Sequence, residues 1–288
     1  MADAILVTGA TGFIGGYLVA ALQEAGYLTF THSTKQGNIA SCPLDFKGVR
    51  HVFHLAAKTG APESWQAPPD YYEVNVLGTV NALEFCKRER ASITYVSSYV
   101  YGKPQRLPIP EDHPLQSFNP YSHSKIVAED VVRFYNSHLD IQTTIVRPFN
   151  VYGPGQAPRF LLPTLLRQIL DPECQQITVA DNRPRRDYIH VNDLVSLLLA
   201  TISGTPSTVY NAGSGVSTGV EELVNIISES ISLPVKPIRS LGQTRSEEIL
   251  DTVADVSRAW RDLNWKPRIA LDVGLREWAD LIRAGAQI

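Results

Sequence analysis

The first half of the chain alternates between two hydrophobic patterns. Short apolar runs rich in β-forming residues predict strands, and longer stretches with apolar residues three or four positions apart predict helices. The predicted strands are 4–8, 27–31, 51–55, 93–97 and 141–146, and the predicted helices are 13–25, 70–87 and 121–136. Strands that alternate with helices form βαβ units, in which a parallel sheet is buried on both faces.

The connection before the strand at 51–55 is unusually short. Residues 33–50 would have to hold a crossover, a third strand near 39–42 and the route to the next strand. A βαβ crossover takes at least about 10–12 residues, so two full helices do not fit. We therefore expect a third strand here, with one or both helices reduced to a turn or loop.

The second half of the chain is more irregular. Helical patterns cover 159–170, 192–203, 219–230 and 271–283, between short strands and loops rich in Pro and Gly. Because no Ser/Gly linker separates the two halves, we expect the second half to be a lobe that packs on the first.

Composition narrows the class of protein. The chain has 288 residues, of which 44% are hydrophobic and 19% charged, and this excludes a mainly disordered chain. The net charge of −3 provides no basic excess for nucleic acid. No apolar run approaches the roughly 18 residues of a membrane span, and Asp3 with no basic segment argues against a signal peptide.

The three cysteines are Cys42, Cys86 and Cys174, far apart and outside any CxxC motif. This odd, scattered set argues against a disulfide framework and against a zinc site. We expect reduced thiols in a cytoplasmic protein that has no metal centre.

A glycine motif joins the first predicted strand to the first predicted helix. Gly9, Gly12 and Gly15 are spaced as GxxGxxG. Glycine at the turn lets backbone N–H groups approach a pyrophosphate, the helix N-terminus attracts negative charge, and Gly15 allows close helix–strand packing. With further βαβ units behind it, the motif predicts dinucleotide binding.

These observations define the expected fold class as α/β, a doubly wound parallel (Rossmann) sheet with a smaller α+β C-terminal substrate lobe. We assign residues 1–149, completed by about 187–212, to the dinucleotide-binding domain. Residues 150–186 and 213–288 are assigned to the substrate-binding lobe.

The chain contains two Tyr-x-x-x-Lys pairs, Tyr99–Lys103 and Tyr121–Lys125. The first straddles Gly102, whereas the second lies on an uninterrupted helical pattern, where residues four apart share a face. A neighbouring ammonium and a cationic nicotinamide favour the phenolate of Tyr121. Tyr121 is therefore the candidate general acid/base.

Two serines, Ser97 and Ser98, lie where the preceding predicted strand ends. A hydroxyl at this position would hydrogen-bond to the reacting oxygen and hold it in line. We interpret Ser98 as a structural hydroxyl.

The segment TGATGFIG at 8–15 resembles the extended branch of the short-chain dehydrogenase/reductase superfamily. Nearly the whole chain is similar to its NAD(P)-dependent nucleotide-sugar epimerase/dehydratase family, whose members include the UDP-glucose 4-epimerases. The further matching segments are PES at 62–64, YYEVNVLGT at 71–79, RPFNVYGPG at 147–155, RDYIHVND at 186–193, YNAGSG at 210–215, TVAD at 252–255 and LNWKP at 263–267.

The resemblance implies roles for named residues. The family has an (S/T)xxVYG segment whose catalytic hydroxyl maps to Ser97, so the implied catalytic set is Ser97, Tyr121 and Lys125. The implied cofactor-binding residues are Gly9, Gly12, Phe13, Ile14, Gly15, Ser33, Asp45, Phe46, Leu55, Ala56, Ala57, Lys58, Asn75, Tyr121, Lys125 and Pro148. The implied substrate residues are Asn150, Arg186 and Arg245 around the diphosphate, and Glu248 on the nucleotide ribose.

The chain also departs from the family pattern. NAD-specific folds carry Asp or Glu at the end of the second strand, but residues 31–35 read THSTK, which favours NADP. The acidic pair of the dehydratases is replaced by Ser98 and Tyr99. The cysteine that supports 3,5-epimerisation is absent at Tyr99 as well.

The resulting hypothesis is hydride transfer at a ring carbon, C4, of a nucleotide-diphosphate sugar, with NAD or NADP as cofactor. A 4-epimerase is slightly favoured over an NADPH-dependent 4-ketoreductase. A small-molecule ketone reductase of the same superfamily and a non-catalytic dinucleotide sensor are the remaining alternatives. By analogy with the family, we expect a homodimer that packs helices 70–87 and 121–136 against those of a second copy.

Overall fold

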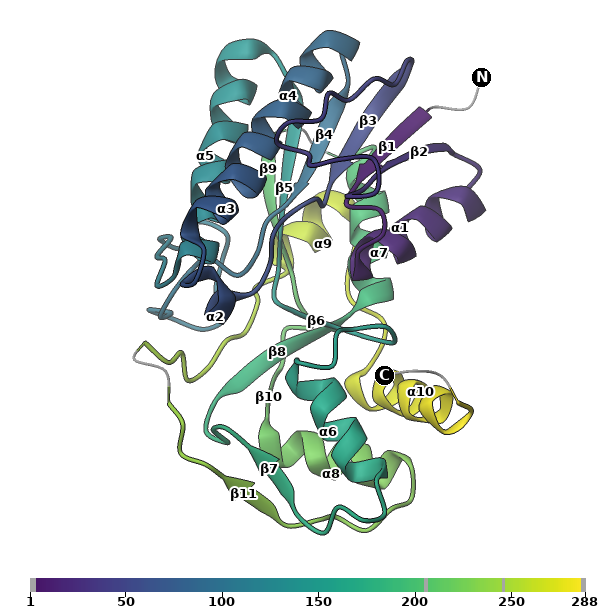
Figure 1. Cartoon of the computed structure of the whole chain (residues 1–288), viewed down its shortest axis with the longest axis vertical. Helices are drawn as coiled ribbons and strands as arrows, with labels where there is room; N and C mark the ends of the chain where they lie inside the picture. The colour runs from purple at the N-terminus through teal and green to yellow at the C-terminus, as the bar shows by residue number, and fades with distance from the viewer. Residues whose placement is uncertain (1–3, 205–206, 245–246, 286–288) are drawn as a thin grey trace.

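A six-stranded parallel sheet forms the larger part of the molecule, with a smaller lobe beyond one end of it (Figure 1). The computed structural model describes residues 4–204, 207–244 and 247–285. The strand order is β2-β1-β3-β4-β5-β9, and every pair in it is parallel. The predicted α/β class and its parallel sheet are therefore confirmed.

The strands of this sheet agree with the short apolar runs of the sequence. They are β1 (Ala4–Thr8), β2 (Leu28–His32), β3 (Val49–His54), β4 (Ser92–Val96), β5 (Thr143–Pro148) and β9 (Thr208–Ala212). Helices cover both faces, as the burial of the strands on both sides requires. These helices are α1 (Phe13–Glu24) and α7 (Val191–Thr201) on one face, and α4 (Gly78–Glu89) and α5 (Pro120–Leu139) on the other.

The expected third strand near residues 39–42 is wrong. Residues 33–48 contain turns and irregular backbone, and β1 pairs directly with β3, which leaves β2 as the outermost strand. The expectation that the crossover helices would be reduced is confirmed, since neither helix forms. Ile39 and Leu44 still reach the core under α4, so this loop covers the sheet face with side chains in place of a helix.

The predicted helix 70–87 is broken into three consecutive pieces. These are α3 (Pro68–Tyr72), the π-helical η1 (Glu73–Leu77) and α4. A short α2 (Ala61–Ser64) precedes them. A π-helical turn inserts one residue into the α pattern and is often found at functional sites.

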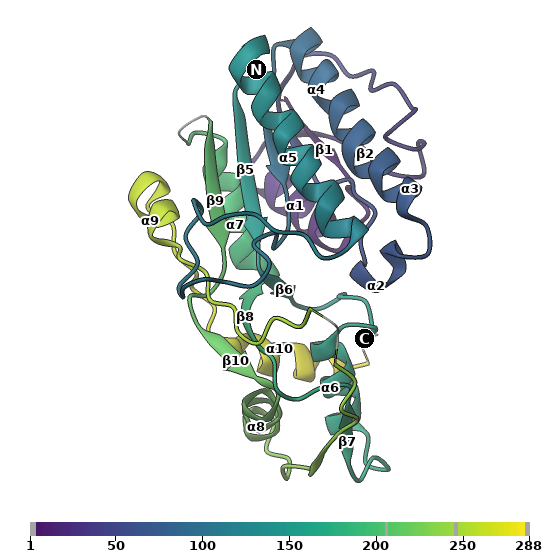
Figure 2. The same cartoon turned by 90° about the vertical axis from the view of Figure 1, so that its left-hand side faces the viewer.

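The smaller lobe lies beyond one end of the large sheet (Figure 2) and has a hydrophobic core of its own. Its sheets have the strand orders β10-β8-β6 and β11-β7. Its elements are β6 (Asn150–Tyr152), α6 (Leu161–Leu170), β7 (Ile177–Val179), β8 (Arg185–His190), β10 (Ser217–Gly219), α8 (Val220–Ser230), β11 (Ile238–Ser240) and α10 (Leu271–Arg283). One further helix, α9 (Ser257–Leu263), contacts β9, and its Ala259 joins the core of the large sheet. Our proposed lobe assignment of 213–288 therefore includes a helix that packs on the other half.

Within the described parts of the chain, no helix is long and apolar enough to cross a membrane. The same residues contain no group of three or more His, Cys, Asp or Glu side chains that could hold a metal ion.

Candidate active site

The ends of the parallel strands meet at one edge of the large sheet, and the candidate residues gather there. The register pairs Thr8 at the end of β1 with His32 on one side and with His54 on the other. In open α/β sheets, ligands bind at this carboxyl edge, where the strand order reverses.

The glycine loop after β1 packs more closely than any side chain allows. Gly9 has a φ of 73°, and a Cβ on it would lie 2.7 Å from the backbone nitrogen of Ala56. A Cβ on Gly15 would lie 2.2 Å from the carbonyl oxygen of Gly9. The loop, the first turn of α1 and the residues after β3 therefore form a backbone cradle that a Cβ would fill.

The first turn of α1 begins without a side-chain cap. Gly12 is the N-cap residue, and the first turn contains no acidic residue. The N–H groups of this turn, which includes Phe13 and Ile14, are left to attract an anion. A dinucleotide pyrophosphate fits this cradle in both shape and charge.

The end of β2 offers hydroxyls and no carboxylate. Ser33 donates from its backbone nitrogen and its Oγ to Oε1 of Gln36, at 2.9 and 2.7 Å. Asp45 is exposed on the following loop, and the Phe46 ring packs 5.4 Å from the Phe30 ring.

Asn75 of the π-helical turn joins the segment after β3 to α5. Its Oδ1 accepts from the backbone nitrogen of Lys58 at 2.7 Å, and its Nδ2 donates to Lys58 O at 3.1 Å and to Ser124 Oγ at 2.9 Å. The Lys58 ammonium is paired with Asp70.

Lys125 is buried between α5 and the end of β4. Its Nζ donates to the carbonyl oxygen of Val96 at 2.7 Å and lies 4.3 Å from the centre of the Tyr95 ring. Burial lowers the pKa of Lys125 to about 7, although the charge of Glu129 opposes the change. Lys125 therefore titrates near neutral pH.

Tyr121 lies one helical turn before Lys125 on the same face of α5. Burial raises the pKa of Tyr121, and a hydrogen bond with the Ser98 side chain partly opposes the rise. The lowering that we expected from the Lys125 ammonium is not among the causes of this shift. The Tyr121 phenol therefore stays protonated at neutral pH under the influence of the protein alone.

The two serines after β4 occupy different surroundings. Ser97 is buried, and a hydrogen bond from its side chain is among the causes that lower the pKa of Glu129. Ser98 is partly exposed and interacts with Tyr121. Our structural interpretation of Ser98 missed this contact, because an offset of 23 residues between strand end and helix leaves no periodic signal.

A buried ion pair supports the Tyr–Lys helix from behind. Glu129, one turn after Lys125, accepts from Arg147 Nε at 2.9 Å and from Arg147 Nη2 at 2.6 Å. Burial by itself would raise the pKa of Glu129, but the Arg147 guanidinium holds that pKa below its usual range.

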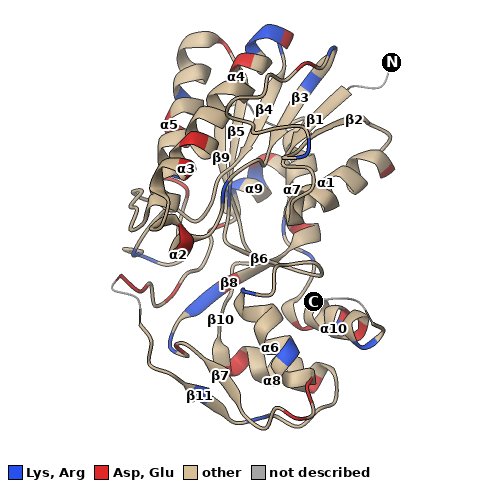
Figure 3. Ribbon diagram, viewed as in Figure 1, with Lys and Arg blue, Asp and Glu red and all other residues tan. Residues whose placement is uncertain are grey.

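Two of the substrate candidates on the lobe, Arg186 and Glu248, are paired with each other. Figure 3 shows basic residues along β8, where Arg186 Nη2 contacts Glu248 Oε1 at 2.6 Å. Asn150 Nδ2 donates to the backbone oxygen of Asp187 at 3.1 Å. Pro148 is the last residue of β5, two residues before Asn150 at the start of β6. Arg245 lies outside the described residues.

The rejected Tyr–Lys pair does not act as a unit. Tyr99 donates to the carbonyl oxygen of Gly102 at 2.7 Å, and burial raises its pKa. Lys103 instead forms an ion pair with Glu247 of the lobe at 2.6 Å. Tyr99 is therefore not prepared for proton transfer.

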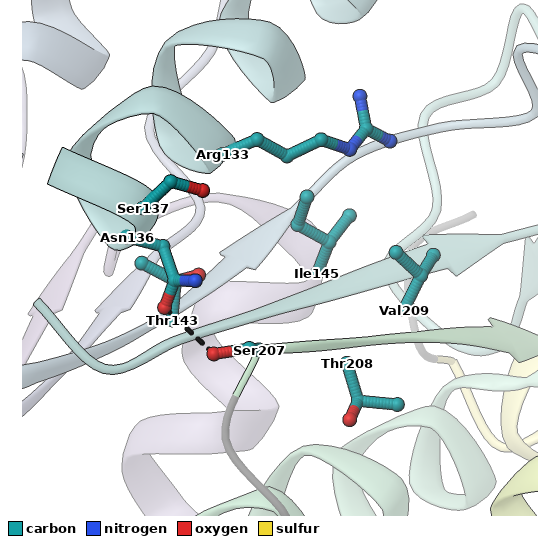
Figure 4. A pocket seen from close by; sticks show the side chains of 8 residues that line it. All are labelled: Arg133, Asn136, Ser137, Thr143, Ile145, Ser207, Thr208 and Val209. Atoms are coloured by element: carbon teal, nitrogen blue, oxygen red, sulfur yellow. Dashed lines mark hydrogen bonds between the residues drawn. The ribbon is translucent and has the colours of Figure 1, made fainter.

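A separate hollow lies at the opposite end of β5 and β9 (Figure 4). The Arg133 guanidinium on its rim is already paired with Glu129 and Asp130. Ser207 there donates to Asn136. This hollow contains none of the candidate site residues.

Comparison with known proteins identifies relatives over nearly the whole chain. The model of the NAD-dependent epimerase/dehydratase family matches residues 5–213. A putative UDP-glucose 4-epimerase of Methanocaldococcus jannaschii is 31% identical, over 94% of this chain and 96% of that protein. A GDP-6-deoxy-D-mannose reductase of Pseudomonas aeruginosa is 28% identical, over 98% and 99%.

Solved structures of similar fold carry dinucleotides. MoeE5 in complex with UDP-glucuronic acid and NAD superposes with a TM-score of 0.85 at 30% identity, covering 98% of this chain and 99% of MoeE5. RMD from Pseudomonas aeruginosa, complexed with NADPH, has a TM-score of 0.85 at 27% identity, covering 96% and 98%.

Proposed function

This chain belongs to the NAD-dependent epimerase/dehydratase family, and on that premise we propose that it transfers a hydride at C4 of a nucleotide-diphosphate sugar. The protein is an NAD(P)-dependent enzyme of the extended short-chain dehydrogenase class. The observation that carries the proposal is the pair Tyr121 and Lys125, on one face of α5 at the carboxyl edge of the sheet, where Lys125 is held by Val96 O.

We assign proton transfer to the Tyr121 hydroxyl. A bound nicotinamide dinucleotide supplies the hydride donor or acceptor, and its oxidised ring brings a positive charge. Because burial raises the pKa of Tyr121, the phenolate needs that charge together with the Lys125 ammonium. Proton removal is then tied to the presence of the cofactor.

Ser97 orients the sugar oxygen in this proposal, and Ser98 is a structural hydroxyl. Ser97 is the position indicated by the family motif, and it is buried directly after β4. Ser98 is already in contact with Tyr121. We expect Ser97→Ala to lower kcat about 10²-fold and Ser98→Ala to lower it less than about fivefold. Equal small losses in both variants would contradict an orienting role for either serine.

Hydride transfer alone is the chemistry that the site supports. Dehydration needs an acid and a base beside the orienting hydroxyl, and these positions hold Ser98 and Tyr99. Tyr99 is bound to Gly102 O, and its pKa is raised. We therefore propose an epimerase or a reductase and no dehydratase.

We propose that Arg186 and Arg245 bind the diphosphate, that Asn150 contacts it or the atoms near it, and that Glu248 binds the nucleotide ribose. Two guanidinium groups suit a group with about two negative charges. In support, Arg186 and Glu248 lie together on the lobe, where the substrate would separate them. The other proposed cofactor contacts, at 55–58, lie around the backbone cradle.

Within this chemistry, 4-epimerisation is slightly favoured. A 4-epimerase returns the hydride to the opposite face of the keto intermediate and keeps its cofactor, whereas a 4-ketoreductase exchanges NADPH. Similarity to a putative UDP-glucose 4-epimerase supports the first, and the missing carboxylate at residues 31–35 supports the second. We also propose a homodimer through residues 70–87 and 121–136, where Leu77 of η1 and Phe134 of α5 are 48% and 54% exposed.

Mass spectrometry of the purified protein separates the two reactions. Tightly held NAD supports the epimerase, and an empty site with preference for NADPH supports the ketoreductase. Thermal shifts with UDP, GDP and dTDP then test the nucleotide, and no shift with any of them would favour a small-molecule ketone reductase.

The Tyr121→Phe variant tests the assigned proton transfer. We expect kcat to fall about 10²–10⁴-fold while the dissociation constant of the dinucleotide stays within about threefold. Unchanged turnover in this variant would exclude Tyr121 as the acid/base, and binding without turnover in the wild type would indicate a dinucleotide sensor.

A further inference from the structure

Two buried histidines on β3 have matching environments. His51 and His54 are 5% and 1% exposed, and each ring contacts two hydroxyl groups. His51 Nδ1 lies 2.7 Å from Ser92 Oγ, and its Nε2 lies 3.0 Å from Thr94 Oγ1. His54 Nδ1 lies 2.7 Å from Thr8 Oγ1, and its Nε2 lies 3.1 Å from Thr79 Oγ1. Only the second set reaches the candidate active site.

The hydrogen bonds around His54 have a single direction. Thr79 Oγ1 donates its one proton to the carbonyl oxygen of Asn75 at 2.6 Å, so it must accept from His54 Nε2–H. Nδ1 is then the acceptor of a hydrogen bond that the Thr8 hydroxyl donates. Thr8 Oγ1 in turn accepts from the backbone nitrogen of Ala56 at 3.4 Å. A neutral imidazole with its proton on Nε2 satisfies every member of this chain.

This series of hydrogen bonds begins at the glycine loop and ends at the Tyr–Lys helix. Thr8 directly precedes Gly9. At the other end, the Asn75 side chain donates to Ser124 Oγ at 2.9 Å, and Ser124 Oγ donates to the backbone oxygen of Tyr121 at 2.7 Å. Buried and partly buried hydrogen bonds, linked through the backbone and side chain of Asn75, therefore join the cofactor cradle to the proposed acid/base.

The hydrogen bonds of His54 reach the π-helical turn. Asn75 lies in η1, where the backbone departs from the α pattern before it returns at Gly78. The Thr79 hydroxyl binds the carbonyl one turn back, a bond that competes with regular helix geometry. His54 holds the Thr79 hydroxyl toward the Asn75 carbonyl oxygen, and the Asn75 side chain itself is bound by Lys58 and Ser124.

We propose that His54 is a positioning residue, which sets Asn75 and the Tyr121 end of α5 against the dinucleotide site through Thr79. The inference rests on the proposed function. Burial lowers the pKa of His54 to about 3, so the imidazole keeps this pattern throughout the neutral range. His51 has the same lowered pKa without a link to the site, which makes it the matched control.

Two amide substitutions separate the two links of His54. The Asn amide occupies the place of Nδ1, so His54→Asn keeps the bond to Thr8 and loses the bond to Thr79. The Gln amide reaches the place of Nε2, so His54→Gln keeps the bond to Thr79. Each variant loses one hydrogen bond, and similar losses in melting temperature are expected.

The measurement is fluorescence titration with NADH and NADPH, with kcat and KM alongside. For His54→Asn we expect the dissociation constant to rise about tenfold, which is the value of one hydrogen bond, with a fall in kcat. His54→Gln and His51→Asn should both stay within about threefold of the wild type. Equal effects of His54→Asn and His51→Asn on binding would overturn the proposal.

Hydrogen exchange provides a second readout that needs no cofactor. We expect the amides of residues 119–126 to exchange faster in His54→Asn and to be unchanged in His51→Asn. Where His54→Asn does not fold, Thr79→Val replaces it, with Thr79→Ser as the variant that restores the hydroxyl and Thr94→Val as the control. Unchanged exchange in 119–126 would overturn the inference, whereas a wild type that binds no dinucleotide contradicts only the proposed function.

Discussion

Two arginine–glutamate pairs, one in each part of the molecule, differ in burial and in hydrogen bonding. Arg147 and Glu129, behind the Tyr–Lys helix, are bound through two hydrogen bonds, and their side chains are 2% and 0% exposed. Arg186 and Glu248, on the lobe, share one close contact, and their side chains are 20% and 12% exposed. The pair behind the Tyr–Lys helix is therefore fixed before any ligand arrives, whereas the proposed substrate residues on the lobe would exchange each other for the ligand.

The largest expected difference between the two pairs is in stability. Glu129→Gln leaves a buried guanidinium without its anion, so we expect the free energy of unfolding to fall by about 3–5 kcal/mol. Glu248→Gln should lower it by less than about 1 kcal/mol, because its partner has access to water. Urea unfolding of both variants measures the difference. Equal losses would mean that the lobe is as rigidly built as the sheet.

Acid should destabilise the sheet half through its buried histidines. The pKa values of His51 and His54 are lowered to about 3, so between pH 6.5 and 3 the unfolded chain binds more protons than the folded one. Stability is present above pH 6.5 and is lost as the pH falls, by up to about 1.4 kcal/mol per pH unit for each histidine. Melting curves at pH 7 and 5 measure the slope, which His51→Gln should reduce. An unchanged slope would place the acid sensitivity elsewhere.

The smallest expected effect concerns substrate binding on the lobe. Arg186→Gln removes the proposed diphosphate contact, which would be made equally in the ground state and transition state, so KM should rise about tenfold with kcat within about twofold. Arg185→Gln is the control, because Arg185 is paired with Glu222. A matching rise in KM for Arg185→Gln would indicate a general charge effect in place of a defined contact.

The fold was predictable where burial of apolar residues alone determines the element. The strands of the large sheet follow from apolar runs that only a doubly covered sheet can bury. The prediction of a strand near 39–42 was wrong, because Ile39 lies in a loop and its apolar side chain packs under α4. The π-helical turn at 73–77 could not be predicted, because it depends on contacts with Lys58 and Ser124 that are distant in sequence.

The site was predictable where spacing along one element carries the information. Tyr121 and Lys125 share a helix face, and Gly9 and Gly15 share a turn. By contrast, the contact of Ser98 with Tyr121 and the proposed role of His54 depend on how separate strands are placed side by side. Hydrogen bonds of this kind leave no periodic signal in one sequence.

The missing third strand also affects how the protein behaves in concentrated solution. The sheet ends at β2, and among the described residues no further strand pairs with its outer side. Leu28 at the start of this strand is 52% exposed. An open edge with an apolar residue is a template on which another chain can add a strand, so aggregation of this protein is expected to begin at residues 28–32.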